Sequence, residues 1–444
     1  MPITFSHRLN MKRRIISWIV LLMAACLANA ETAAAQSDAA ARGSRNVTLV
    51  NHVAVEGGTG AVEVEQDPAR PYAYLSKQAG PGGFVVMSLA QPDAPQLLLS
   101  WDLEGPSTSQ ENAGRDVVYF KLRDRYYLVQ AFQPDAAHPQ AGLGAVIFDV
   151  TGLPDAASVR EVARIREATA AGGFHSLFAY KHSDGRALLF ATGGGAIHVY
   201  DLERLLATGG GLVTQIDTPE QLETASTGYD AVFVGFEPDT GQDRFYGAGA
   251  GGYYIYDVTD PTNATLLTSI SSAAVQRGRA IAPTPDGRYA VTAASYRTAP
   301  LRIFDLHPGL DKTIPRIRTA VGAWTANWRN EYTDLEVRWP FVFVTALEDG
   351  LQVFNINDPL NPYTDAFYRT AETLPETPAN PLTPPHGAVS VDVRNSDGLI
   401  VVSDLETGFW AFYLETFEGW HGHGWGLPNM SSAQDWDNGP DGAR

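Results

Sequence analysis

Residues 254–270, with the sequence YIYDVTDPTNATLLTSI, contain the pattern that decides the fold. Apolar and aromatic residues lead to Asp257, a turn with Asp260 and Pro261 follows, and a second run of apolar and β-branched residues begins near Ala264. Such runs are typical of short strands, and Asp and Pro are typical of the turns between them. The segment therefore predicts two consecutive strands joined by a tight turn.

The same phrase recurs along the chain at intervals of roughly 50 residues, which is the signature of a repeat architecture. The clear copies are GAVIFD from Gly144, AIHVYD from Ala196, YYIYD from Tyr253, LRIFD from Leu301 and LQVFN from Leu351. Weaker copies are FVVMS from Phe84 and FWAFY from Phe409. The chain thus contains seven copies of one unit.

Each unit contains four strands. Hairpin turns such as SDGR at 183–186, PDGR at 285–288 and SDG at 396–398 separate alternating apolar runs ahead of the phrase, so three strands precede the Pro turn and one follows it. Seven four-stranded units with no credible helix between them predict an all-β fold, a seven-bladed β-propeller over residues 46–415. A long array of β-sandwiches is the alternative.

The two ends of this region predict how the ring closes. The seventh unit supplies three strands and then runs into a tail rich in Gly, Trp and His, whereas NVTLVNHVAV at 46–55 is a strand left over before the first unit. Pairing this N-terminal strand with the last blade would satisfy the unpaired backbone groups of both. We expect that closure, and we expect the tail at 416–444 to be flexible.

Residues 1–30 have the pattern of a secretory signal peptide. Lys12, Arg13 and Arg14 precede an apolar run at 15–27, and the small-residue sequence Ala-Asn-Ala at 28–30 follows. Translation is expected to start at Met11, just before the basic residues. No other stretch is long and apolar enough to span a bilayer.

The sequence therefore predicts export to the periplasm or to the cell surface or extracellular space, with residues 31–45 as an Ala-rich linker. Cys26, the single cysteine, lies inside the signal, and an imperfect lipobox around it makes lipoprotein anchoring a minor alternative. A mature chain without cysteine excludes disulfides, thiolate metal sites and cysteine nucleophiles.

The charge of the chain argues against nucleic acid as a partner. The formal net charge is -18, and removal of residues 1–30 removes four basic residues and no acid, which gives -22. A polyanion would be repelled by such a protein.

The segments VIFDVTGLPDAASVREVARI from Val146, YIYDVTDPTNATLLTSIS from Tyr254 and LQVFNINDPLNPYTDAFYRT from Leu351 resemble LVIVD repeats, a family of bacterial exported repeat proteins. The resemblance implies a β-propeller with a binding or surface role, and it supplies no catalytic residues. The aspartates of the phrase are expected to anchor the turn that follows by accepting hydrogen bonds from nearby backbone amides. They are Asp149, Asp201, Asp257 and Asp305.

In a propeller the starts of the innermost strands surround one mouth of the central channel. The residues predicted there are Arg115, His175, Tyr229, Asp230, Arg279, Asp334 and His386. They could hold a small anionic or zwitterionic ligand, because Arg binds carboxylate and phosphate in bidentate fashion. Alternatively, Arg115 and Arg279 pair with Asp230 and Asp334 and hold neighbouring blades together.

Trp324 and Trp328, in a long loop at 321–333, are further candidates for ligand binding at the rim, where aromatic residues often recognise sugars or peptides. The alternative is that they pack over the blade tops.

The sequence favours an exported binding or protein-interaction module over an enzyme, and no catalytic residue, metal ligand or cofactor motif is assigned. The partner would be a small molecule, a glycan or a protein, and the sequence does not give the oligomeric state. The alternative is a metal-dependent hydrolase or lyase that uses the His and Asp residues of the channel mouth.

Overall fold

The structure is a computed structural model that describes residues 42–78, 82–104, 114–134, 142–166, 172–219, 228–327, 331–371, 386–422, 425, 430–437 and 439. The chain divides into two units, Met1–Arg45 and Asn46–Arg444. All seven sheets lie in the second unit. None of the described helices is long and apolar enough to cross a membrane.

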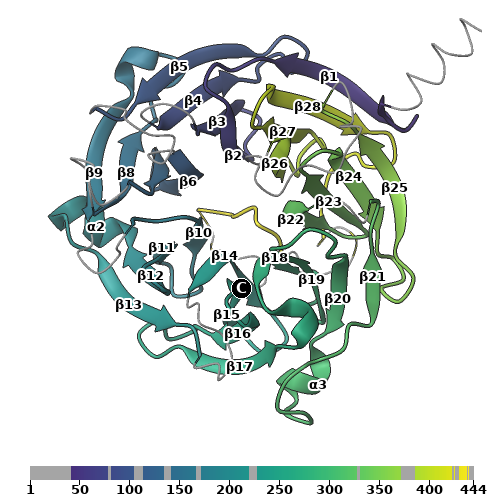
Figure 1. Cartoon of the computed structure of the whole chain (residues 1–444). Helices are drawn as coiled ribbons and strands as arrows, with labels where there is room; N and C mark the ends of the chain where they lie inside the picture. Colours follow the sequence, from purple (N-terminus) through teal and green to yellow (C-terminus); the bar gives the residue numbers. More distant parts are fainter. Residues whose placement is uncertain are drawn as a thin grey trace, which may run out of the picture. The chain divides into compact units, whose positions relative to one another are not determined.

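Seven four-stranded antiparallel sheets surround a common centre in this unit, as Figure 1 shows. The first three are β2 (Thr59–Val64), β3 (Tyr72–Lys77), β4 (Gly83–Ser88) and β5 (Gln96–Asp102); β6 (Gly114–Leu122), β7 (Arg125–Phe132), β8 (Leu143–Asp149) and β9 (Arg160–Arg166); and β10 (Leu177–Lys181), β11 (Ala187–Gly193), β12 (Ala196–Asp201) and β13 (Leu212–Asp217). The next three are β14 (Tyr229–Glu237), β15 (Gln242–Gly249), β16 (Gly252–Asp257) and β17 (Thr265–Ile270); β18 (Gly278–Pro283), β19 (Tyr289–Ala294), β20 (Leu301–Asp305) and β21 (Gly322–Trp324); and β22 (Tyr332–Arg338), β23 (Phe341–Ala346), β24 (Gly350–Asn355) and β25 (Tyr363–Tyr368). The seventh is β26 (Ala388–Val393), β27 (Ile400–Asp404), β28 (Gly408–Leu414) and β1 (Val47–Val53). The predicted seven-bladed β-propeller is confirmed.

The ring closes as the sequence predicts, because β1 is the outer strand of the seventh blade. It pairs antiparallel with β28, with Val47 opposite Leu414 and Val53 opposite Phe409. The His52 ring stacks on Trp410 with a centroid distance of 3.8 Å, and its Nε2 lies 2.7 Å from the Thr407 carbonyl oxygen. Two distant parts of the sequence thus complete one sheet.

The repeated aspartates anchor the turns after the third strands. Asp149, Asp257 and Asp305 each accept a hydrogen bond from the backbone amide two residues later, at 3.1, 2.9 and 3.0 Å. Asp201 accepts instead from the Arg204 amide, at 3.0 Å, and caps the short helix α2 (Leu202–Thr208). The sequence reading missed α2 and the single turn α3 (His307–Leu310), because each replaces only one connection.

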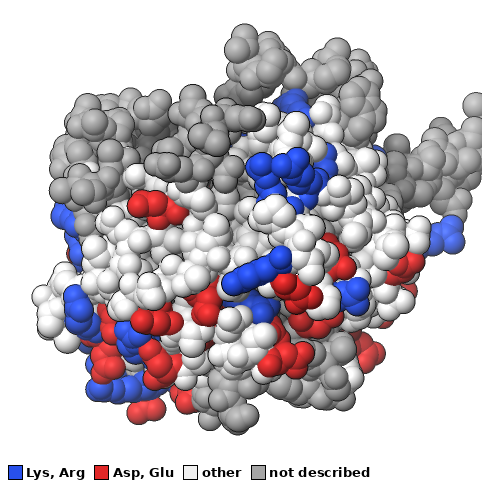
Figure 2. All heavy atoms as spheres, turned by 90° about the horizontal axis from the view of Figure 1, so that it is seen from below, with Lys and Arg blue, Asp and Glu red and all other residues white. Residues whose placement is uncertain are grey.

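The hydrophobic core lies between adjacent blades. Side chains of alternating strand residues from two neighbouring sheets face each other, as where Phe84 of β4 packs on Phe148 of β8 at a centroid distance of 4.8 Å. On the side drawn in Figure 2, Asp and Glu lie mainly along the lower rim among scattered Lys and Arg, while other charged residues, such as Arg338 and Asp392, are buried. Packing between blades therefore holds the innermost strands, and the residues at their starts, in fixed positions.

Candidate functional site

A cavity of about 480 Å³ lies at the starts of the innermost strands, and we call it the mouth cavity. Five of the predicted residues line it: Arg115, His175, Asp230, Arg279 and Asp334. Its other polar lining residues are Gln78, Asp116, Ser176, Arg297, Glu331, Thr333 and Ser390. The structure therefore brings together predicted residues from five consecutive blades.

Two guanidinium groups in the mouth cavity have no carboxylate partner among the described residues. Arg115 and Arg279 make no ion pair there, and the Arg115 Nε atom is buried without a hydrogen bond. Arg279 donates from Nε only to the Thr333 carbonyl oxygen, at 3.3 Å. Burial and the charge of Arg279 both lower the pKa of Arg115, so an anion between the two would relieve an unfavourable arrangement.

Asp230 does not pair with either of these arginines. Its carboxylate accepts hydrogen bonds from Arg277 instead, at 3.0 Å from Nε and 3.3 Å from Nη2. The alternative expectation, in which Arg115 and Arg279 hold blades together through Asp230 and Asp334, is wrong for the described residues. The partner of Asp230 is the arginine that precedes the inner strand of the next blade.

His175 contributes a neutral imidazole. Burial, followed by the charges of Arg279 and Arg115, lowers the pKa of His175 to about 4. Its backbone amide donates to the Thr192 carbonyl oxygen at 3.0 Å, which fixes the residue just ahead of β10. At neutral pH the ring can therefore donate or accept a hydrogen bond but adds no positive charge.

Asp334 lies further into the central channel than its predicted place at the channel mouth. Like Asp116, it lines both the mouth cavity and a second one behind it. The Asp334 carboxylate accepts hydrogen bonds from the Leu335 amide at 2.9 Å, from the Ser390 hydroxyl at 2.8 Å and from the Val391 amide at 3.2 Å. The strand register of β22 shifts between Tyr332 and Asp334, so counting residues from the strand start does not give the depth.

Asp116 makes the equivalent contacts between the second and third blades, and sequence reasoning missed it. It accepts from the Val117 amide at 2.8 Å, from the Ser176 hydroxyl at 3.1 Å and from the Leu177 amide at 2.7 Å. The signal that could have revealed it is the shared pattern of Asp followed by an aliphatic residue, Asp116-Val117 and Asp334-Leu335. Burial raises the pKa of Asp334, and it raises that of Asp116 to about 6.

A second cavity, of about 140 Å³, continues below this layer and is lined by Glu63, Glu336 and Asp392. We call it the inner cavity. Asp116, Ser176, Asp334 and Ser390 line both cavities. Burial is the largest cause that raises the pKa of each of the three inner carboxyls, and that of Asp392 rises to about 7.

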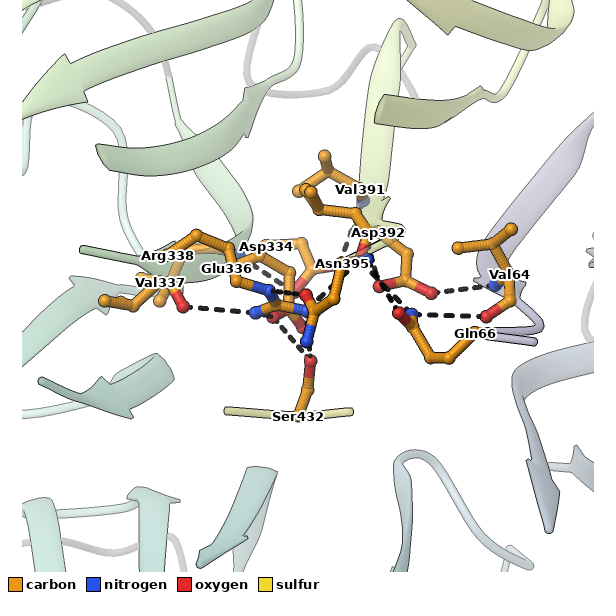
Figure 3. Close-up of polar contacts among 12 residues, drawn as sticks. Val64, Gln66, Asp334, Glu336, Val337, Arg338, Val391, Asp392, Asn395 and Ser432 are labelled. Atoms are coloured by element: carbon orange, nitrogen blue, oxygen red, sulfur yellow. Dashed lines mark hydrogen bonds and ion pairs between the residues drawn. The ribbon is translucent and has the colours of Figure 1, made fainter. Parts of the chain in front are cut away.

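The far end of the inner cavity is covered by residues 430–437, which we call the C-terminal strap. Figure 1 shows it, in yellow, crossing the middle of the ring. The Ser432 hydroxyl donates to Glu336 at 2.7 Å and accepts from Arg338 at 3.0 Å, and Trp436 packs near Phe120 of the second blade. Figure 3 shows Arg338 between Glu336, Asn395 and Ser432. This part of the predicted tail is therefore placed against the propeller.

Comparison with known proteins supports the fold. No family model matches the chain, and no curated protein matches its sequence. Among solved structures, the chain is similar to the crystal structure of Chaetomium thermophilum Raptor, with a TM-score of 0.58 and 12% identity over 87% of this chain and 31% of that one. The chain thus spans less than a third of that protein. The likeness shows a β-propeller fold and no shared ligand, partner or activity.

The other predicted residues that the structure describes are not among the residues that line the mouth cavity. Trp324 is buried, stacks on Phe354 at 4.7 Å and donates from Nε1 to the Thr364 hydroxyl at 3.0 Å, so it is a packing residue between blades. Tyr229 is also buried, and its hydroxyl donates to the Asp217 carbonyl oxygen at 3.1 Å. His386 Nε2 lies 3.9 Å from a Glu348 carboxylate oxygen, outside the cavity lining. Trp328 lies outside the described residues.

Within the described ranges, no group of three or more His, Asp or Glu side chains is arranged to hold a metal ion. His175, His386, Asp230 and Asp334 are therefore not gathered into one ligand set. Among the described residues, the metal-dependent enzyme alternative therefore gains no support from a ligand cluster.

Proposed function

We propose that this propeller is a binding module whose mouth cavity holds a small ligand through a carboxylate or phosphate group. The observation that carries the proposal is the pair Arg115 and Arg279, which share one cavity without a carboxylate partner among the described residues. Placing two like charges in a partly buried space is costly unless an anion lies between them. Guanidinium groups also match the geometry of carboxylate and phosphate oxygens.

The neutral His175 ring fits the same role, because it can donate one hydrogen bond to an anion without repelling the arginines. Asp230 is held by Arg277 at the cavity wall, which keeps one carboxylate of the lining neutralised. The cavity thus offers an anion the two cationic donors Arg115 and Arg279 and one neutral donor, while a third lining arginine, Arg297, lies 3.9 Å from a Glu348 carboxylate oxygen.

Calorimetric titration of the full chain with butanoate and with inorganic phosphate tests the proposal. At least one probe should bind, and Arg115→Gln with Arg279→Gln should weaken binding at least tenfold. The matched control is Arg316→Gln with Arg318→Gln, which removes two exposed guanidiniums beyond α3 and should leave affinity unchanged. Binding that survives the mouth substitutions, or no binding by wild type, would overturn the proposal.

We further propose that the chain is exported and belongs with the LVIVD-repeat proteins. The support is the signal-like order of residues 1–30 and the repeated phrase. Expression in a bacterial host, cell fractionation and mass spectrometry of the N-terminal peptide provide the test. A soluble product beginning at Glu31 supports cleavage, a lipid-modified Cys26 supports the lipoprotein alternative, and an intact N-terminus in the cytoplasm contradicts export.

A further inference from the structure

Arg115 and Arg279 line the mouth cavity and not the inner cavity, whereas the carboxylates of Asp116 and Asp334 lie at the junction of the two. The mouth cavity also holds the carboxylates of Glu331 and of Asp230, which pairs with Arg277. Side chains two residues further along the inner strands face the same way, because strand residues alternate. The residue two beyond Asp334 is Glu336, whereas the residue two beyond Asp116 is Val118. Glu63 and Asp392 hold the equivalent positions in the first and seventh blades, two residues beyond Ala61 and Ser390.

The Asp116 and Asp334 carboxylates are held in place without being neutralised. Each accepts three hydrogen bonds, all from backbone amides or a serine hydroxyl, and neither has a Lys or Arg within ion-pair distance among the described residues. Arg279 favours the ionised form of Asp334 only through its charge at longer range. A cation would therefore find two oriented carboxylates here.

The inner cavity is lined by further acidic side chains. The charge of Arg338 acts on all of Glu63, Glu336 and Asp392, and Arg338 pairs directly with Glu336 at 2.6 Å. The C-terminal strap covers the far end through Ser432. Burial raises the pKa of these three carboxyls and so favours their neutral forms, which leaves Asp116 and Asp334 as the carboxylates that an anion moving inward meets first.

We infer that the ligand of the mouth cavity is a zwitterion, with its carboxylate at Arg115 and Arg279 and its ammonium group directed inward to Asp116 and Asp334. This inference rests on the proposed function and adds the chemical class of the ligand. An ammonium group satisfies the acid layer that a plain carboxylate would leave unpaired. A ligand with both groups complements both layers, and neither half alone does so.

Pairs of probes that differ by one amino group test the inference on wild-type protein. The full chain is titrated with 4-aminobutanoate and butanoate, with 6-aminohexanoate and hexanoate, and with butylamine. For at least one chain length the amino acid should bind at least tenfold more tightly than the carboxylate. Butylamine alone should bind more weakly than the amino acid.

The Asp116→Asn variant then tests whether the Asp116 carboxylate binds the ammonium group. This substitution should reduce the preference for the amino acid to less than threefold while butanoate affinity stays equal or rises. Asp392→Asn is the matched control. Asp392 also accepts a backbone amide across a blade boundary, from Val64 at 2.7 Å, and one from the next residue Val393 at 2.6 Å, but it lines only the inner cavity. The control should keep the preference.

The outcomes separate the two proposals. Equal or tighter binding of the plain carboxylates overturns the zwitterion inference and leaves the anion site standing. No binding by any probe overturns both. If Asp116→Asn fails to fold, which loss of the near-ultraviolet circular dichroism signal would reveal, the wild-type ratio of amino acid to carboxylate still decides.

Discussion

The Asp334 carboxylate on the inner strand of the sixth blade accepts a hydrogen bond from the Ser390 hydroxyl on the inner strand of the seventh, at 2.8 Å. Asp116 and Ser176 repeat this contact between the second and third blades at 3.1 Å. The same aspartates line the mouth cavity. Asp116 and Asp334 therefore both hydrogen-bond to a neighbouring blade and line the candidate site.

The first prediction concerns the hydrogen bond between Asp334 and Ser390. Asp334→Ala should lower the free energy of unfolding by about 2–4 kcal/mol, because buried amide donors lose their acceptor, and Ser390→Ala by about 1 kcal/mol. A double-mutant cycle in urea should give a coupling of about 0.5–2 kcal/mol. The double-mutant cycle for Asp116 and Ser176 should give a coupling free energy of the same sign. If the losses of unfolding free energy are strictly additive in both cycles, the aspartate–serine hydrogen bond does not stabilise the fold.

The second prediction concerns pH. Burial and the Glu336 carboxylate raise the pKa of Asp392 to about 7, against about 3.9 for an unfolded chain. The folded state therefore holds this proton more tightly, and the stability it contributes is complete below about pH 4 and is lost as pH rises through about 7. Relative to wild type, Asp392→Asn should gain stability between pH 5 and pH 8, by an amount on the order of 1–3 kcal/mol.

Urea unfolding at several pH values measures this gain. Asp358→Asn provides the control, because Asn361 and the Leu360 amide lower the pKa of Asp358, so it remains ionised throughout this range. The difference between wild type and that variant should stay constant. If the difference in unfolding free energy between Asp392→Asn and wild type is also independent of pH, the raised pKa of Asp392 is contradicted.

The third prediction compares two neighbouring serines of the C-terminal strap. Ser432→Ala should cost about 1–3 kcal/mol, since it removes hydrogen bonds to the Glu336 carboxylate and from Arg338. Ser431→Ala should be neutral or slightly stabilising, because the buried Ser431 hydroxyl has no hydrogen-bond partner among the described residues. Equal thermal midpoints for the two variants would show that the strap does not dock through Ser432.

The fourth prediction concerns ring closure. A chain that begins at Glu56 lacks β1, so it exposes the edge of β28 and uncovers Trp410, which is 1% exposed in the intact ring. It should lose more than about 3 kcal/mol of stability, as expected when a buried contact set is removed. A synthetic peptide of residues 46–55 should restore the thermal midpoint by adding the missing strand. An unchanged midpoint without β1 would contradict the closure.

The fifth prediction links ligand binding to His175. Because burial and the two arginines hold its pKa at about 4, a bound carboxylate should raise that pKa, and binding should take up protons. Butanoate affinity should therefore rise about three- to tenfold from pH 7 to pH 5. His175→Asn should show a smaller rise, which reflects protonation of Asp116 alone; an identical rise would exclude His175 from the site.

Several local features could be predicted because they depend on neighbours in sequence. The Asp turns at Asp149 and Asp257 follow from a side chain that reaches amides two residues away. The N-terminal strand was found because the last repeat lacks one. Asp116 and the depth of Asp334 could not be found by counting, because irregular registers in β6 and β22 break the period of two.

The sequence by itself determined the seven blades, the closure through β1 and the convergence of Arg115, His175, Asp230 and Arg279, since repetition fixes which residues begin each inner strand. Only the tertiary structure decided which of them pair. Asp230 accepts hydrogen bonds from Arg277, and Asp334 accepts one from Ser390. Trp324 packs against Phe354 in the core. Arg115 and Arg279 have no carboxylate partner among the described residues. Ion pairs and hydrogen bonds depend on distances of a few ångströms between separate blades, and a repeat period does not encode them.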